Sequence, residues 1–168
     1  MRVERVEVRR IELPLRAPFE TSFGRTTRKS FLLVAASADG VVGLGECVAD
    51  DDPFYLPETN QTALHVMRDF LAPMLFALDV AHPREVLPAF SRVRGHEMAK
   101  AALEMAVWEL AARREGAPLW RLLGGRPGVV EAGVSIGLQA DDASLVERVA
   151  AEAAAGYRRV KGKIKPGR

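Results

Sequence analysis

The sequence has one cysteine, few aromatic side chains and almost no net charge. Cys47, the single cysteine among 168 residues, cannot form an internal disulfide, which agrees with a reducing compartment. The formal net charge is only +2, and Phe, Trp and Tyr together make up 7% of the chain. Nucleic-acid binding needs basic patches and, for single strands, aromatic stacking platforms, so these values argue against a nucleic-acid partner.

Long apolar runs are also missing. The apolar stretch 31–36 is short and Pro73 interrupts the stretch 70–78, so we expect no membrane span. The first five residues alternate charge with valine and contain no apolar signal core, which predicts a cytoplasmic protein. Apolar residues still make up 48% of the chain, which is enough for a buried core in one domain, or in one domain and the start of another.

The first third of the sequence has the period-two pattern of strands. Apolar and polar residues alternate over 6–15, residues 31–36 are typical of a more buried strand, and residues 41–48 follow the turn dipeptide Asp39-Gly40. This pattern predicts an antiparallel meander of about three strands, with a loop at residues 17–27 between the first two. Gly43-Leu44-Gly45 falls inside the third strand and is therefore not a phosphate-binding loop.

The middle of the sequence is helical. Prolines at 57 and 83 open helices, and the clearest helix runs from Glu97 to Gly116, with apolar residues at three- and four-residue steps. We expect the large apolar side chains of this helix to belong to the core rather than to a cofactor site: Met98, Met105 and Trp108.

The pattern changes again after residue 128. A strand at 130–137, a helix at 141–155 and a strand at 158–164 predict a βαβ unit with parallel strands and a right-handed crossover. The natural domain boundary lies where the helices end and the βαβ pattern begins. It gives an α+β domain at 1–125 and the opening of an α/β domain at 126–168. Parallel sheets are normally covered on both faces. The single predicted helix covers one face of this strand pair and nothing in the sequence covers the other face, so we expect a piece of a longer protein.

Lysines alternate along the last predicted strand, at 161, 163 and 165. Side chains two residues apart share a face, so Lys161, Lys163 and Lys165 project one way and the intervening residues the other. In a parallel barrel that face is the interior, where neighbouring like charges disfavour the protonated form and move a lysine toward accepting a proton. A solvated edge strand, on which lysines discourage aggregation, explains the same pattern equally well.

Other polar residues are weaker candidates. Asp50-Asp51-Asp52 precede Pro53 and are interpreted as a solvated loop, because consecutive acids do not converge on one ion. Ser135 lies on the first strand of the βαβ unit, where its hydroxyl either faces a ligand or is satisfied inside the fold. The histidines lack metal-ligand spacing and are interpreted as surface or structural residues: His65, His82 and His96.

Several stretches resemble one enzyme family. The chain is similar to the o-succinylbenzoate synthase / N-acylamino acid (N-succinylamino acid) racemase family, in the muconate-lactonizing-enzyme subgroup of the enolase superfamily. The resemblance spans nearly the whole chain in the family's order and is specific for the subgroup. The matching stretches are residues 13–15, 19–24, 43–48, 95–106, 122–125, 133–137 and 156–167.

The resemblance implies an enolase-like capping domain followed by the first βαβ of a (β/α) TIM-like barrel. Members of the family bind Mg²⁺ or another divalent cation and abstract a proton α to a carboxylate, which gives an enediolate. By residue-to-residue match, Lys163 is the acid/base and Lys161 orients and neutralises near the substrate carboxylate. The remaining implied substrate-binding positions are one pocket residue and residues of two closing loops: Ser135, Phe19, Phe23 and Tyr55.

Two departures from the family pattern limit what the resemblance implies. Gly162 stands where the family usually has a larger apolar residue, and the family's metal ligands and second catalytic lysine come from later strands, beyond Arg168. We therefore expect no metal ligand in this chain and no activity from the 168 residues alone.

The implied activities are o-succinylbenzoate synthesis, a dehydration in menaquinone biosynthesis, and N-acylamino acid racemisation. Both pass through one enediolate step, so the sequence does not separate them. The alternatives are a muconate cycloisomerase, a dipeptide epimerase or a non-catalytic remnant. The expected partner is a small carboxylate substrate, and a homo-oligomer is expected.

Overall fold

The computed structural model describes residues 1–21 and 24–164. The chain separates into two compact units. Unit 1 comprises Met1–Leu13 and Ser30–Arg126, and unit 2 comprises Pro14–Lys29 and Pro127–Arg168. The first two strands therefore contribute to both units.

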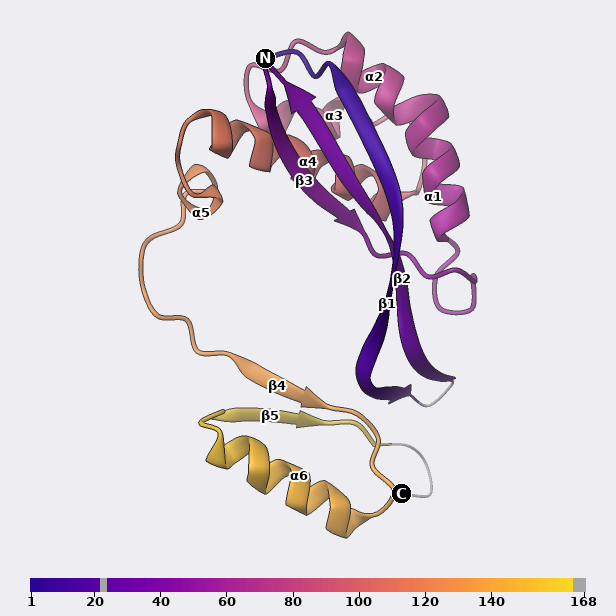
Figure 1. Cartoon of the computed structure of the whole chain (residues 1–168), viewed down its shortest axis with the longest axis vertical. Coiled ribbons are helices and arrows are strands. Elements are labelled where there is room, and N and C mark those ends of the chain that lie inside the picture. The colour runs from indigo at the N-terminus through magenta and orange to yellow at the C-terminus, as the bar shows by residue number, and fades with distance from the viewer. Residues whose placement is uncertain (22–23, 165–168) are drawn as a thin grey trace. The chain divides into compact units, whose positions relative to one another are not determined.

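The N-terminal strands form an antiparallel meander, as the sequence predicts. Strands β1 (Arg5–Thr21), β2 (Gly24–Ala38) and β3 (Val41–Cys47) lie in the order β1-β2-β3, and Figure 1 shows β1 and β2 as a long hairpin. Asp39 and Gly40 join β2 to β3 with φ of 49° and 75°, the left-handed conformation that an Asp-Gly hairpin turn adopts. The predicted loop at 17–27 is wrong for residues 17–21 and 24–27, which belong to β1 and β2, and residues 22 and 23 lie outside the described residues.

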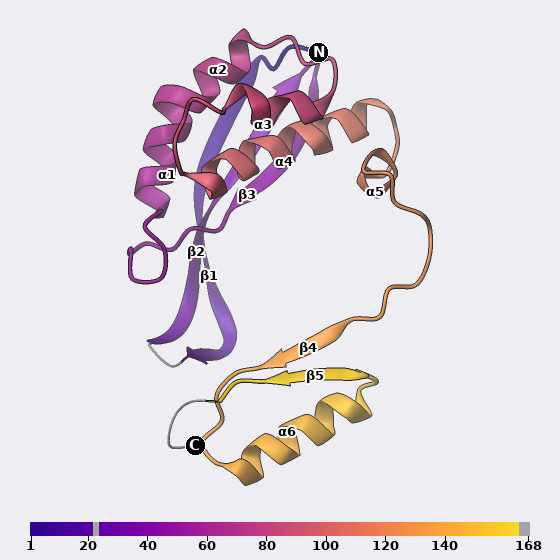
Figure 2. The same cartoon turned by 180° about the vertical axis from the view of Figure 1, so that it is seen from behind.

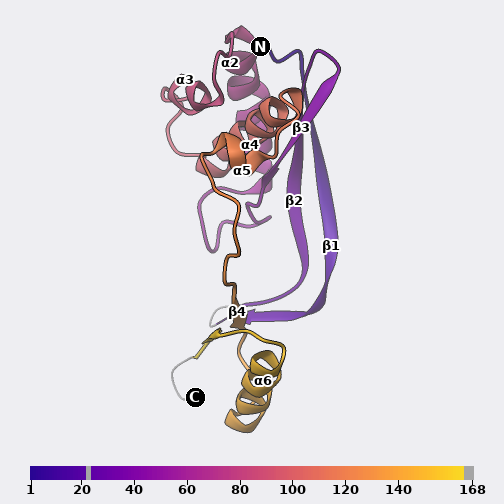
Figure 3. The same ribbon diagram turned by 90° about the vertical axis from the view of Figure 1, so that its left-hand side faces the viewer.

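Helices cover one face of this meander in unit 1 (Figures 2 and 3). The longest of them, α4 (Glu97–Arg114), contacts β3 most extensively. The other helices of unit 1, in chain order, are α1 (Asn60–Val66), the π-helix η1 (Met67–Leu71), α2 (Ala72–Ala77), the 3-10 helix η2 (Pro83–Glu85), α3 (Val86–Ala89) and α5 (Leu119–Leu122), the last of which contacts α4.

Helix α4 approaches β3 so closely that only glycines fit between them. A Cβ added to Gly43 would lie 2.1 Å from the carbonyl oxygen of Ala106, and one added to Gly45 would lie 2.1 Å from that of Ala102. These distances are far inside van der Waals contact, so the two glycines are required by the close approach of two backbones. The Gly43-Leu44-Gly45 motif lies inside a strand, as predicted, and the structure shows that it allows the close packing of α4.

The core of unit 1 lies between the meander and the helices, and alternate residues of β2 contribute to it. The α4 residues that face β3 are small or aliphatic and recur at helical spacing: Ala99, Ala102, Leu103, Ala106, Val107 and Leu110. Trp108 is buried and Met98 packs against this core, as predicted. The prediction for Met105 is wrong: its side chain is 42% exposed, because position 105 lies off the stripe that faces the sheet.

The α1–η1–α2 segment continues through Pro73 without a break in the helix. The Ala72 N–H donates to the Met67 carbonyl, five residues earlier, which is the wider π-helical spacing. Proline has no N–H and its ring clashes with the carbonyl four residues before it in a regular α-helix. The π turn just before Pro73 provides the extra backbone room that this ring needs.

Unit 2 contains the predicted βαβ segment. Strands β4 (Gly133–Ile136) and β5 (Arg159–Gly162) pair in parallel, and α6 (Asp142–Ala154) connects them. The Asp141 side chain caps the helix by accepting the Ser144 N–H at 2.7 Å. Both strands are shorter than the predicted 130–137 and 158–164. Among the described residues of this unit, Ile136 is the one apolar side chain in the buried class.

Across the described ranges, none of the helices combines the length and the apolar character that a membrane crossing requires.

Candidate active site

The two lysines of the predicted site lie on the face of β5 away from the helix. Lys161 belongs to β5 and Lys163 follows its last residue. A Cβ added to Gly162 would lie 3.7 Å from the Leu145 Cδ1 atom of α6, so Gly162 faces the helix. Because side chains alternate along a strand, Lys161 and Lys163 point to the opposite face. Lys165 lies outside the described residues.

Ser135 lies beside Lys161 in the parallel pair. The register aligns Ser135 with Lys161 and Ile136 with Gly162, and parallel neighbours in register share a face of the sheet. The Lys163 N–H extends the pairing by donating to the Ile136 carbonyl at 3.1 Å. The Ser135 hydroxyl and the lysine amines therefore belong to one face, near the carboxyl ends of the two strands.

Phe19 contacts Lys163 directly. The Lys163 Nζ atom lies 4.0 Å from the centroid of the Phe19 ring, within the range of a cation–π interaction. Lys163 is half-buried, whereas Lys161 is exposed. The structure thus brings Phe19, Lys163, Lys161 and Ser135 together on unit 2.

Two further loop residues, Tyr55 and Phe23, are predicted to close over the substrate. Tyr55 belongs to unit 1, where its side chain is 67% exposed in the segment between β3 and α1. Phe23 lies outside the described residues. Their roles over a substrate stay predictions.

The aspartate run contributes a structural network. Asp51 accepts hydrogen bonds from Asn60 Nδ2 at 2.8 Å and from Arg10 Nη2 at 2.9 Å. The hydrogen bond from Asn60, followed by the charge of Arg10, lowers the pKa of the Asp51 carboxyl below its usual value. This carboxylate ties the start of α1 to β1.

The histidines also have structural partners. His65 Nδ1 lies 2.7 Å from an Asp69 carboxylate oxygen, and His82 accepts the Arg84 N–H at 3.1 Å. No three His, Cys, Asp or Glu side chains of the described residues come together as metal ligands. The described residues therefore supply no ligand set for the divalent ion that the resemblance implies.

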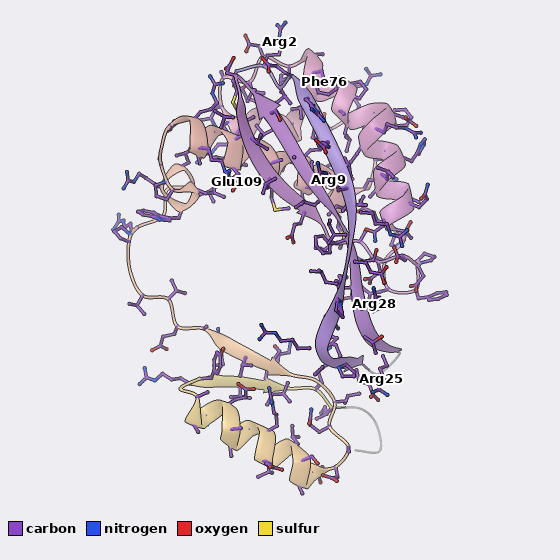
Figure 4. The ribbon with its side chains drawn as sticks, viewed as in Figure 1. Arg2, Arg9, Arg25, Arg28, Phe76 and Glu109 are labelled. Carbon is purple, nitrogen blue, oxygen red and sulfur yellow. The ribbon has the colours of Figure 1, made fainter. Side chains whose placement is uncertain are left out.

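Two glutamates have roles that the sequence analysis missed. The buried Glu58 accepts the N–H groups of Met98 at 3.0 Å and Ala99 at 2.8 Å, and so caps α4 from another part of the chain. Glu109, on α4 beside β3 (Figure 4), accepts the Leu44 N–H on the free edge of that strand. Each pairing joins segments distant in the sequence, so a local pattern carries no signal for it.

The architecture defines the class of protein. A three-stranded meander covered on one face by helices, followed by a parallel strand–helix–strand segment, is the enolase-type capping domain and the start of a barrel. Residues 4–124 match the family described as mandelate racemase / muconate lactonizing enzyme, N-terminal domain. The chain belongs to this family, within the enolase superfamily.

Relatives match along nearly the whole chain. It is 47% identical to the o-succinylbenzoate synthase of Geobacillus stearothermophilus, over 98% of this chain and 44% of that protein. It is 44% identical to the N-succinylamino acid racemase of Thermus thermophilus, over 99% of this chain and 45% of that protein. A solved enolase-superfamily structure from Listeria innocua superposes with a TM-score of 0.94 at 37% identity, over 100% of this chain and 46% of that one. The chain thus spans less than half the length of these relatives.

Proposed function

We propose that the chain is the N-terminal part of an enzyme that abstracts the α-proton of a small carboxylate substrate and forms an enediolate. In this proposal the capping domain covers residues 1–125 and the barrel begins at 126–168. The enzyme acts as an o-succinylbenzoate synthase, an N-acylamino acid racemase or both. Relatives with each of these names match at nearly equal identity, which supports the two activities alike.

The observation that carries the proposal is the position of the two lysines. Both point to the face of the sheet that lies away from α6, where Ser135 is their neighbour on β4. Lys163 is half-buried, and its Nζ atom contacts the Phe19 ring. In a barrel this face is the interior, and the strand ends carry the reacting groups.

Each residue has a distinct role in the proposed reaction. Lys163, as the free amine, accepts the α-proton, and the electron pair of the broken C–H bond moves into the carboxylate to give the enediolate. Lys161, as the ammonium, lies beside that carboxylate and neutralises its growing charge. Ser135 lines the pocket with a hydroxyl. In dehydration the electron pair of the enediolate then forms the new C=C bond, the β C–O bond breaks, and the hydroxide leaves as water with the proton that Lys163 took up. In racemisation a proton is returned to the opposite face of the α-carbon instead.

The divalent cation that the family resemblance implies is proposed to bind to a segment outside these 168 residues, as is the acid that serves the opposite face. The chain alone is therefore expected to catalyse neither dehydration nor racemisation.

A chimera tests the proposal. Residues 1–168 replace the matching segment of the Geobacillus stearothermophilus o-succinylbenzoate synthase, and exchange of the substrate α-proton with deuterium from solvent is followed by NMR. We expect exchange in the chimera and its loss in Lys163→Ala, by a factor of about 10³ or more, whereas Lys29→Ala serves as the matched lysine control. Exchange at the parental rate in Lys163→Ala rules out the role of Lys163. Turnover by the 168-residue chain alone contradicts the expectation that it is inactive.

A further inference from the structure

The tip of the β1–β2 hairpin belongs to the same compact unit as the β4–α6–β5 segment. Unit 2 includes Pro14–Lys29, although the remainder of both strands belongs to unit 1. Phe19 lies in this tip, and its ring is the group that meets the end of the Lys163 side chain.

Both partners of this contact are fixed at the same point of β4. The Lys163 backbone is held there because its N–H donates to the Ile136 carbonyl at 3.1 Å. The Phe19 ring lies above the next residue, since a Cβ added to Gly137 would be 3.9 Å from Phe19 Cδ2 and 3.7 Å from the Glu20 carbonyl oxygen. The end of β4 and the residue after it thus bring the Phe19 ring and the Lys163 backbone close together.

The contact with Phe19 restricts the orientations that the Lys163 side chain can adopt. A lysine side chain has four rotatable bonds, and a charged end group that is free in solvent samples many rotamers. A cation over the face of an aromatic ring is attracted by the negative face of the ring. Within the described part of the chain, no carboxylate forms an ion pair with Lys163, so the ring is the charge-complementary group beside its ammonium.

We propose that Phe19 is a positioning residue for Lys163: its ring face packs against the end of the lysine side chain and directs the Nζ atom over the carboxyl ends of β4 and β5. This goes beyond a role in covering the substrate, because it acts on the lysine before any substrate is present. The catalytic consequence rests on the proposed function, whereas the contact itself can be measured in this chain.

The first test is spectroscopic and needs no activity. The chain has only five lysines, so the ε-methylene signals of a ¹³C-lysine sample can be assigned from Lys→Arg variants. The ring current of Phe19 is expected to move the Lys163 signal upfield of the other four. Phe19→Leu, which keeps an apolar side chain without a ring, removes this shift, and Phe19→Tyr retains it. Phe54→Leu in unit 1 is the matched control and leaves the signal unchanged. A Lys163 signal that is the same in Phe19→Leu as in the parent chain overturns the proposal.

The second test asks whether the contact matters for proton transfer. In the chimera, Phe19→Leu is expected to lower kcat for α-proton exchange about tenfold or more, and Phe19→Tyr restores it. Equal rates for the two variants, with the shift lost in Phe19→Leu, overturn the positioning role. If Lys163→Ala retains exchange, the proposed function fails, and the lysine signal still decides whether Phe19 orients the side chain.

Discussion

Helix α4 in unit 1 and helix α6 in unit 2 each lie beside a strand, but they bury very different shares of their residues. Ten of the 18 residues of α4 are buried, whereas none of the 13 residues of α6 is. Helix α6 has strong local signals, namely the Asp141 cap and an Arg148–Glu152 ion pair at 2.6 Å. Local signals of this kind set where a helix begins and ends, but tertiary packing supplies most of its stability. Unit 1 should therefore be the stable part of the described chain.

The same contrast appears in the glycines. Gly43 and Gly45 on β3 leave no space for a Cβ, whereas Gly162 on β5 leaves a normal contact distance to α6. Replacing glycine by alanine is therefore expected to lower the stability of unit 1 at Gly43 and to raise that of unit 2 at Gly162.

The largest expected effect is that of Gly43→Ala. The new methyl group would overlap the Ala106 carbonyl and the Leu110 backbone, which belong to a helix that cannot yield without moving away from the sheet. We expect a loss of at least about 3 kcal/mol in the free energy of unfolding. Urea denaturation followed by tryptophan fluorescence measures it, because Trp108 and Trp120 both lie in unit 1. An unchanged urea midpoint would contradict the close contact between β3 and α4.

A matched pair of valine substitutions compares the two helices directly. Val107 of α4 is fully buried and Val146 of α6 is 68% exposed. We expect Val107→Ala to cost about 2 kcal/mol and Val146→Ala to change stability by less than about 0.5 kcal/mol. Hydrogen exchange of the α4 amides in Val107→Ala and of the α6 amides in Val146→Ala, each compared with the parent chain, gives the two values. Equal costs at the two positions would mean that α6 packs as tightly as α4.

Gly162→Ala should have a smaller effect of the opposite sign. The added methyl would meet Leu145 at ordinary van der Waals distance, and alanine restricts the unfolded chain more than glycine does. We expect a gain of about 0.5 kcal/mol, seen as slower exchange of the β5 amides. Faster exchange would indicate that the strand requires glycine for its backbone conformation.

The sequence predicts most of the fold because its signals are local. The turn at Asp39-Gly40, the cap at Asp141 and the two-residue spacing of Lys161 and Lys163 each follow from neighbouring residues. The length of the two strands β1 and β2 was not predictable in this way, because residues 17–21 and 24–27 carry the composition of a loop but belong to strands. The contact of Phe19 with Lys163 joins two segments that are distant in the sequence and meet at Gly137. No pattern of neighbouring residues could predict it.

The smallest effect on stability is expected from the loss of a surface ion pair. This prediction tests whether buried packing alone accounts for the expected stability of unit 1. The hydrogen bond from Arg68, with its charge, lowers the pKa of the Asp69 carboxyl from 3.8 to about 2. A lowered folded-state pKa stabilises the fold above the unfolded value, and this contribution is lost as the pH falls through about 2. Because Asp69 is at the surface, solvent and salt screen the pair.

We expect Arg68→Ala to raise the pKa of Asp69, measured by carboxyl ¹³C NMR, without moving the urea midpoint at neutral pH. Arg121→Ala, at a distant surface position of the same unit, leaves the titration unchanged. A clear fall in the midpoint for Arg68→Ala would mean that surface charge, and not only the buried face of α4, contributes to the stability of unit 1.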